Sequence, residues 1–194
     1  MHHPSRRSFL KHAAAVGVGA GFGSALPGMS PVHSGGGDEL RIGLIGCGGR
    51  GSGAAHQALS TKGPVKLVAM ADMFADRLDG ALNSLQENPE FRGRIDVPLN
   101  RRYTGFDAAS QLIASELDVV LIATPPHFRP GHFEAAVNAG KHIFFEKPVA
   151  VDAPGVRRVI AAAEVAKQKK LSVVCGLQRH HQYGYLESMA RIHK

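Results

Sequence analysis

Short apolar runs alternate with helix-length segments along most of this chain. The runs with the length of a β-strand cover residues 40–46, 65–71, 102–103 (the weakest), 118–124, 142–146 and 171–176. The run 118–124 (DVVLIAT) is nearly all apolar, as expected of a strand that is buried on both faces of a sheet. The pattern therefore predicts a sheet whose central strands are covered on both sides.

Each strand-length run, apart from the last, is followed by a segment that suits a helix. The predicted helices cover residues 54–59, 75–87, 107–115, 131–139 and 152–170. Gly140 and Asp152 stand where a C-cap and an N-cap are needed, whereas residues 88–115 give the least regular pattern. Alternating strands and helices predict βαβ units with right-handed crossovers. The expected fold class is α/β, a Rossmann-type doubly wound parallel sheet.

Composition and charge narrow the class of protein. The 194 residues are 44% hydrophobic and 20% charged, with two cysteines and no tryptophan, which excludes a disordered chain, collagen and a disulfide scaffold. No apolar run reaches the roughly 20 residues of a membrane-spanning helix. The net charge is +7, and +3 of it lies in residues 1–30. The remaining excess is mild and unclustered, so we expect no nucleic-acid partner.

The first 30 residues have the character of an export signal. Ser-Arg-Arg-Ser-Phe-Leu-Lys at residues 5–11 precedes a Gly/Ala-rich stretch and Pro27-Gly28. The segment resembles a twin-arginine signal peptide. The resemblance implies that the twin-arginine export machinery is a partner and that the location is periplasmic or otherwise extracytoplasmic. We expect a signal at 1–30, a linker at 31–39 and folded structure from residue 40.

A glycine-rich loop follows the first predicted strand. Gly46-Cys47-Gly48-Gly49-Arg50-Gly51 is a G-x-G-x-x-G that opens a predicted helix, the context in which this motif binds dinucleotides. Gly46 allows the tight turn, Gly48 lets the backbone approach a pyrophosphate, and Gly51 lets the helix pack closely on the sheet. Gly49 and Arg50 complete the loop, whose N–H groups suit phosphates.

An acidic residue ends the second predicted strand. Asp72 follows Gly51 at the distance where a carboxylate accepts hydrogen bonds from the adenosine ribose, and its charge repels a 2′-phosphate. This favours NAD over NADP, although Arg50 and Arg77 are placed where either could attract that phosphate. The alternative is a surface Asp72 that caps the next helix.

Two cysteines and several histidines carry no metal signature. Cys47 and Cys175 are too far apart in the predicted sheet to pair easily, and we expect two buried free thiols. There is no C-x-x-C and no metal-spaced cluster, so no metal is expected. His132 falls inside a predicted helix and is interpreted as a packing or surface residue.

Three further motifs give a family resemblance. Ala123-Thr124-Pro125-Pro126-His127 ends one predicted strand, Glu146-Lys147-Pro148 follows the next, and Gly176-Leu177-Gln178-Arg179-His180-His181 comes after the last. Together with the glycine loop, they resemble the glucose–fructose oxidoreductase / inositol dehydrogenase (Gfo/Idh/MocA) family from about Leu40 onward.

The resemblance implies roles at matching positions. Thr124, Pro125 and His127 would line the cofactor near its nicotinamide end. Lys147 would be the catalytic residue, orienting the substrate hydroxyl and assisting removal of its proton. Glu146 would hold a local hydrogen-bond network or contact the cofactor. The alternative for Lys147 is an exposed side chain paired with Glu146.

The resemblance also implies what surrounds this part of the enzyme. It implies a dinucleotide-binding domain at 40–176 and the start of a second α/β domain at 177–194. In family members the second domain carries the substrate pocket and, usually, the oligomer interface. We therefore expect the sequence to be the amino-terminal part of a homo-oligomeric NAD(P)-dependent oxidoreductase acting on a sugar, polyol or related hydroxyl compound. One alternative is an NAD-using glycosidase of the same fold. Another is a nucleotide-binding stub without catalysis.

Overall fold

The computed structural model describes residues 39–193. The predicted signal at 1–30 and nearly all of the predicted linker lie outside the described residues. Within the described part, the strands are β1 (Leu40–Ile45), β2 (Val65–Asp72), β3 (Arg102–Thr104), β4 (Val119–Ile122), β5 (His142–Phe145) and β6 (Val173–Cys175). The helices are α2 (Gly49–Leu59), α3 (Ala75–Gln86), α4 (Ala108–Ala114), α5 (Arg129–Asn138), α6 (Ala153–Gln168) and α7 (Tyr183–Ile192).

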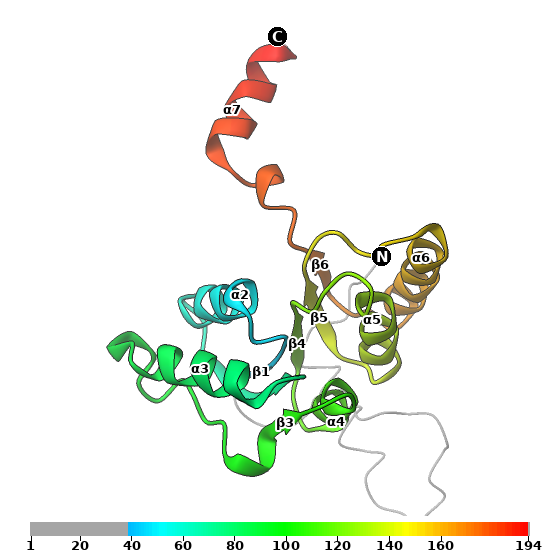
Figure 1. Cartoon of the computed structure of the whole chain (residues 1–194). Coiled ribbons are helices and arrows are strands. Elements are labelled where there is room, and N and C mark those ends of the chain that lie inside the picture. The colour runs from blue at the N-terminus through cyan, green and yellow to red at the C-terminus, as the bar shows by residue number, and fades with distance from the viewer. Residues whose placement is uncertain (1–38, 194) are drawn as a thin grey trace, which may run out of the picture. The chain divides into compact units, whose positions relative to one another are not determined.

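The strands form one parallel sheet in the order β3-β2-β1-β4-β5-β6. Helices α2 and α3 cover one face, and α4, α5 and α6 cover the other (Figure 1). This is the doubly wound Rossmann order, whose direction of winding reverses between β1 and β4. The predicted fold class is therefore confirmed, and the reversal marks the edge where ligands bind in such folds.

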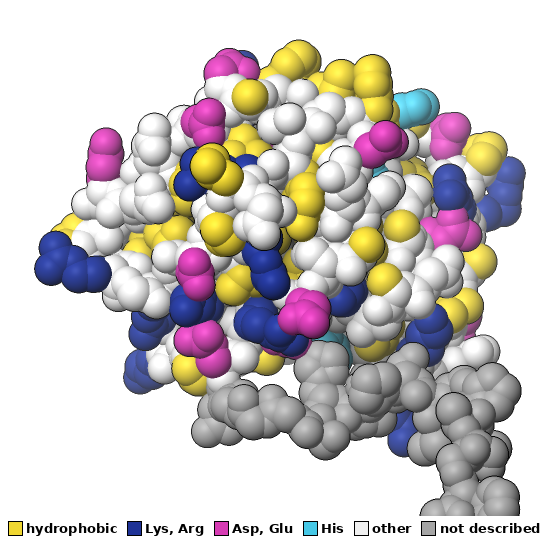
Figure 2. Space-filling view, turned by 90° about the horizontal axis from the view of Figure 1, so that it is seen from below, with side chains coloured by type: hydrophobic (Ala, Val, Ile, Leu, Met, Phe, Trp, Pro, Cys, Tyr) yellow, Lys and Arg dark blue, Asp and Glu magenta, His cyan; other side chains and the backbone are white. Residues whose placement is uncertain are grey.

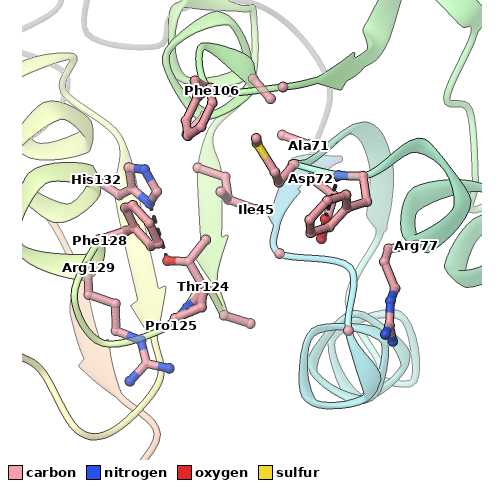
Figure 3. Close-up of a pocket in the computed structure, with 18 residues that line it drawn as sticks. Ile45, Ala71, Asp72, Arg77, Phe106, Thr124, Pro125, Phe128, Arg129 and His132 are labelled. Atoms are coloured by element: carbon pink, nitrogen blue, oxygen red, sulfur yellow. Dashed lines mark hydrogen bonds between the residues drawn. The ribbon is translucent and has the colours of Figure 1, made fainter.

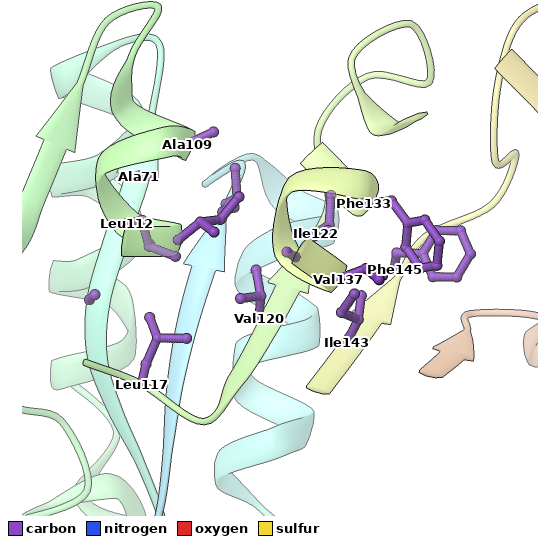
Figure 4. Packing of buried hydrophobic residues seen from close by; sticks show 14 of the residues in the cluster. Ala71, Ala109, Leu112, Leu117, Val120, Ile122, Phe133, Val137, Ile143 and Phe145 are labelled. Atoms are coloured by element: carbon purple, nitrogen blue, oxygen red, sulfur yellow. The ribbon is translucent and has the colours of Figure 1, made fainter. Parts of the chain in front are cut away.

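Two hydrophobic clusters, one on each face, hold the sheet between its helices. The larger cluster packs β4 and β5 against α4 and α5 (Figure 4), and Val159, Ala162 and Ala166 of α6 complete it. In it, the Phe133 and Phe145 rings lie 4.8 Å apart between centroids. The second cluster packs β1 and β2 against α2 and α3. Because β4 has apolar neighbours on both faces, its continuous apolar sequence follows from its place in the sheet.

Several predicted boundaries are wrong by a few residues. Helix α2 begins at Gly49 rather than residue 54, because the glycine loop leads into helical backbone immediately after Gly48. Helix α5 begins at Arg129 rather than residue 131, with Pro130 in its first turn, where the missing N–H costs nothing. Strand β4 covers Val119–Ile122, not 118–124. The residues after Ile122 leave the sheet and turn toward α5.

Asp118 connects the amino ends of two central strands. Its carboxylate accepts hydrogen bonds from the Arg41 backbone N–H at 2.8 Å, from Nε at 3.2 Å and from Nη2 at 3.1 Å. Asp118 is buried, and its charge raises the pKa of Arg41 mainly through this side-chain hydrogen bond. The pair therefore fixes the register of β1 against β4 at the end of the sheet opposite the loops.

The surface carries charges of both signs. On the face in Figure 2, Lys and Arg side chains are interspersed with Asp and Glu. Surface ion pairs of this kind include Arg102–Asp79 and Lys66–Asp96. Among the described residues, no helix is both long and apolar enough to cross a membrane.

Candidate functional site

A cavity of about 640 Å³ opens at the carboxyl ends of β1, β2 and β4 (Figure 3). Residues of the glycine loop, the end of β2, the loop before α4 and the start of α5 form its walls: Ile45, Gly46, Gly48, Ala71, Asp72, Met73, Phe74, Arg77, Gly105, Phe106, Ala108, Ala109, Ala123, Thr124, Pro125, Phe128, Arg129 and His132. The cavity lies where the winding of the sheet reverses. Five residues predicted from the sequence line it: Gly46, Gly48, Asp72, Thr124 and Pro125.

The glycine loop has the backbone geometry that its sequence predicts. Gly46 has φ +92°, in the left-handed region that favours glycine. A Cβ on Gly51 would lie 1.8 Å from the Gly46 carbonyl oxygen, so only glycine fits there. Space is open around the Cβ positions of Gly48 and Gly49. The loop thus packs tightly on the protein side and leaves backbone accessible on the other side.

Asp72 is bound to the loop that it faces. Its Oδ2 accepts a hydrogen bond from the Cys47 backbone N–H at 2.6 Å, and its Oδ1 accepts one from the Phe74 backbone N–H at 3.0 Å. Each carboxylate oxygen has a second lone-pair direction and can still accept a hydroxyl donor. Asp72 therefore ties the end of β2 to the glycine loop and also borders the cavity.

The opposite wall contains residues that sequence reasoning missed. His132 Nδ1 lies 3.2 Å from Thr124 Oγ1, and its ring stacks on that of Phe128 with an interplanar angle of 15°. Phe106 lies across the cavity from them in Figure 3. The interpretation of His132 as a packing or surface residue was incomplete, because it lines the cavity. The sequence does contain a signal that could have identified His132. It lies one turn into the helix that follows β4, and a residue at this position faces back toward the end of that strand.

Burial around His132 predicts a pH dependence of stability. Desolvation lowers the pKa of His132 below its ordinary value of 6.5. The unfolded chain therefore takes up this proton first as the pH falls, so the stabilising effect of a neutral His132 is full above about pH 6.5 and decreases below it. The free energy of unfolding of the wild type should fall between about pH 7.5 and about pH 5.5. In His132→Gln this fall should be smaller, by no more than about 1.4 kcal/mol per pH unit.

Urea unfolding of the wild type and the variant at both pH values measures this difference. His127→Gln is the matched control, because it removes a histidine that is exposed in the turn just before α5, and this variant should keep the wild-type pH dependence. Equal pH dependence in His132→Gln and the wild type would show that His132 does not contribute.

Arg129 is a second residue that the sequence did not single out. It is the first residue of α5 and only 6% exposed. Its Nη1 donates a hydrogen bond to the Pro148 carbonyl oxygen, whereas its Nε has no partner among the described residues. Burial lowers the pKa of Arg129, and the charge of Glu146 opposes that shift. Arg129 thus places a buried cation between the cavity and the turn after β5.

The Glu-Lys-Pro triplet lies beside the cavity rather than in its wall. Glu146 is 2% exposed, and its Oε1 accepts a hydrogen bond from Arg50 Nε at 2.7 Å and forms an ion pair with Arg50 Nη2 at 2.5 Å. Lys147 is exposed, and so is His127. Glu146 therefore pairs with Arg50 and not with Lys147, so the alternative in which Lys147 pairs with Glu146 is wrong. Sequence alone gave no sign of this link, because it joins residues that are 96 positions apart.

The cysteines are free, as predicted, but only one of them is fully buried. Cys47 is buried and Cys175 half-buried. Desolvation, helped by the nearby charge of Asp72, raises the pKa of the Cys47 thiol to about 12. A thiol with so high a pKa is a poor nucleophile at neutral pH. Residues 39–193 contain no group of three or more His, Cys, Asp or Glu side chains arranged to hold a metal ion.

Comparison with known families gives two matches. Residues 40–175 match the model of the Gfo/Idh/MocA oxidoreductase family with an NAD-binding Rossmann fold. Residues 3–23 match the signal sequence of the twin-arginine translocation pathway.

Individual relatives agree with the first match. An inositol 2-dehydrogenase of Agrobacterium fabrum is 32% identical over 148 residues, which cover 76% of this chain and 39% of that protein. A glycosyl hydrolase family 109 protein of Solibacter usitatus is 26% identical over 196 residues, which cover 97% and 42%. The crystal structure of a myo-inositol 2-dehydrogenase from Lactobacillus plantarum has a TM-score of 0.63 and 25% identity, covering 79% and 41%. The chain thus spans about two fifths of the length of these relatives.

Proposed function

Because the chain belongs to the Gfo/Idh/MocA oxidoreductase family with an NAD-binding Rossmann fold, we propose that its cavity binds NAD and that the whole protein oxidises or reduces a polyol, sugar or related hydroxyl compound. The observation that carries this proposal is the glycine loop tied to Asp72 at the point where the sheet reverses its winding. This arrangement fits the group. The tight loop exposes backbone N–H groups, and the neighbouring carboxylate keeps free acceptor capacity.

The loop supplies the site for the pyrophosphate. Helix α2 begins at Gly49, and its first N–H groups have no partner within the helix. These groups and the positive end of the helix dipole suit two phosphates. Gly46 makes the turn and Gly51 brings the helix against the sheet, so the backbone of Gly48, Gly49 and Arg50 is presented to the ligand.

Asp72 sets the preference between the two dinucleotides. Its carboxylate would accept hydrogen bonds from the adenosine ribose hydroxyls, and its negative charge would repel a 2′-phosphate. Arg77 also borders the cavity and is exposed, so it reduces the penalty against NADP. NAD is the proposed cofactor, with NADP as the weaker ligand.

The other end of the site belongs to the residues after β4 and β5. Thr124, Pro125 and His127 would border the nicotinamide end, with the Thr124 hydroxyl oriented by His132. When it is bound, NAD supplies the acceptor for the hydride. Lys147 would hold the substrate oxygen and take part in moving its proton. Glu146 does not act as a base in this proposal, because its carboxylate is bound to Arg50.

Calorimetric titration of the purified chain with NAD and with NADP tests the cofactor proposal. We expect NAD to bind at least about tenfold more tightly, a difference of about 1.4 kcal/mol. Failure of the folded protein to bind either dinucleotide would overturn the proposal. Binding of NAD with no turnover of any polyol would instead favour the non-catalytic alternative.

The signal sequence supports a location outside the cytoplasm. We propose that the twin-arginine pathway exports the folded protein to the periplasm. Replacing both arginines of the pair, Arg6→Lys with Arg7→Lys, should leave the protein in the cytoplasmic fraction, with Lys11→Arg as the control. Unchanged export of the paired variant would contradict this proposal.

One observation supports a second candidate function. The match to the glycosyl hydrolase family 109 protein extends over 97% of this chain, against 76% for the inositol 2-dehydrogenase. A glycosidase that uses NAD internally would release nitrophenol from a nitrophenyl glycoside without accumulating NADH. A polyol dehydrogenase would accumulate NADH and leave the glycoside intact.

A further inference from the structure

In the Glu-Lys-Pro turn, the Lys147 side chain has no contact among the described residues that holds its ammonium group in place. Lys147 is exposed, and no hydrogen bond or ion pair to its ammonium group is found within residues 39–193. Its location therefore depends on the backbone of the two residues that flank it. Both of them are held by arginines.

The residue before Lys147 is held from the glycine loop. Arg50, the second residue of α2, donates a hydrogen bond from Nε to Glu146 Oε1 at 2.7 Å, and its Nη2 forms an ion pair with the same oxygen at 2.5 Å. The carboxylate also lies against Gly176, where a Cβ would come within 2.6 Å of Oε1. Glu146 is therefore enclosed between the start of α2 and the end of β6. It has little freedom to turn.

The residue after Lys147 is held from α5. Arg129 donates from Nη1 to the Pro148 carbonyl oxygen, and its side chain is buried. A buried guanidinium bound to a carbonyl is costly to move, because leaving it would strand both a donor and an acceptor. Arg50 and Arg129 stand at the first turns of two different helices, and both helices begin beside the cavity.

We propose that Arg50 and Arg129 are positioning residues that clamp the Glu146–Lys147–Pro148 turn from both sides, and that Arg50 links this turn to occupation of the glycine loop by a diphosphate. The proposal rests on the proposed function, since it assumes that Lys147 acts at the cofactor site. It assigns the Arg50 side chain to Glu146, while the Arg50 backbone remains part of the phosphate site.

The link to the loop follows from the covalent position of Arg50. Gly48 and Gly49, where a diphosphate would bind, immediately precede it. A ligand that orders these residues also restricts Arg50, and the ion pair passes that restriction to Glu146 and to the backbone of Lys147. Lys147 should then become less free when only the phosphate end of the site is filled.

Competitive acetylation of the full chain, read by mass spectrometry, measures this freedom. The acetylation rate at Lys147 is divided by the rate at Lys62, an exposed lysine after α2. Changes in rate that affect all lysines equally then cancel. ADP is the probe, because it carries the adenosine and the diphosphate but no nicotinamide that could cover Lys147 directly. The variants are Arg50→Gln, Arg50→Lys and Arg129→Lys. Arg158→Gln is the matched control, since Arg158 pairs with Glu134 on the surface at 2.6 Å.

We expect ADP to lower the relative rate at Lys147 at least threefold in the wild type and in Arg158→Gln. In Arg50→Gln, the rate without ligand should rise at least threefold and the effect of ADP should disappear, with Arg50→Lys in between. Arg129→Lys should raise the rate without abolishing the effect of ADP. A folded Arg50→Gln protein with the wild-type rate and the wild-type response would overturn the proposal, as would wild-type behaviour of Arg50→Lys if Arg50→Gln does not fold.

The two proposals fail in different ways. If ADP and NAD do not bind to the wild type, the cofactor proposal is wrong. The clamp is still tested, by the rates at Lys147 without ligand. If ADP binds and Lys147 does not respond to it, the cofactor site stands and the link through Arg50 is wrong.

Discussion

Replacing Gly51 with alanine is expected to destabilise the protein by at least about 3 kcal/mol, at the upper end of the cost of overpacking. The added Cβ would lie 1.8 Å from the Gly46 carbonyl oxygen and 3.3 Å from the Ala123 Cβ. Neither neighbour is the end of a flexible side chain, so the whole start of α2 must move away from β1 and β4. Binding of NAD should be lost with this movement, because the same residues form the phosphate site.

Gly53→Ala is the matched control for this prediction. Gly53 lies in the same helix, and a Cβ there meets nothing nearer than Arg50 Nη1 at 3.6 Å. Alanine should therefore stabilise the helix by about 0.5–1 kcal/mol. Urea unfolding of both variants gives the two free energies. Equal stability of Gly51→Ala and Gly53→Ala would contradict the close packing of the helix on the loop.

Replacing Asp72 with alanine is expected to weaken NAD binding at least about thirtyfold. The change removes the acceptor for the proposed ribose hydrogen bonds and also the acceptors for the Cys47 and Phe74 N–H groups. A hydrogen bond to a charged group contributes about 1.5–3 kcal/mol, and each 1.4 kcal/mol is a tenfold change in affinity. Affinity for NADP should change less than about threefold, since the repulsion of the 2′-phosphate disappears at the same time.

Calorimetric titration of Asp72→Ala with both dinucleotides tests this difference. Asp76→Ala is the control, because Asp76 is an exposed carboxylate in the first turn of α3 and should leave the NAD/NADP ratio unchanged. An equal loss of affinity for NAD and NADP would mean that Asp72 acts only by holding the loop. The proposed preference for NAD would then have another source.

The fold was predictable because its signals are local. Apolar runs such as 118–124 identify the buried strands, and Gly140 and Asp152 mark helix ends, where the structure gives Gly140 a φ of +72° and has Asp152 accept a hydrogen bond from the Gly155 N–H. Predicted boundaries failed where the chain leaves the sheet to form the cavity. There, loop geometry competes with strand propensity, and the sequence pattern gives no warning of the change.

The residues of the candidate site also divide into those that local sequence could identify and those that it could not. Gly46, Gly48 and Asp72 were identified because their roles depend on spacing along one βαβ unit, and they do border the cavity. His132 and Arg129 were missed because a histidine and an arginine at a helix start look like surface residues until the helix is packed against β4. Arg50 was not predicted as the partner of Glu146, because the two residues are 96 positions apart in the sequence.

The sequence by itself determined the parallel α/β fold, the glycine loop with its acidic partner, and the signal motif, because each depends on residue types within a short stretch. Only the tertiary structure decided which charges pair. The sheet brings Arg50 to Glu146 and Arg129 to Pro148, across separations at which sequence carries no spacing rule. Burial then sets the cost of breaking those contacts, and burial is a property of the packed sheet and helices rather than of any one residue.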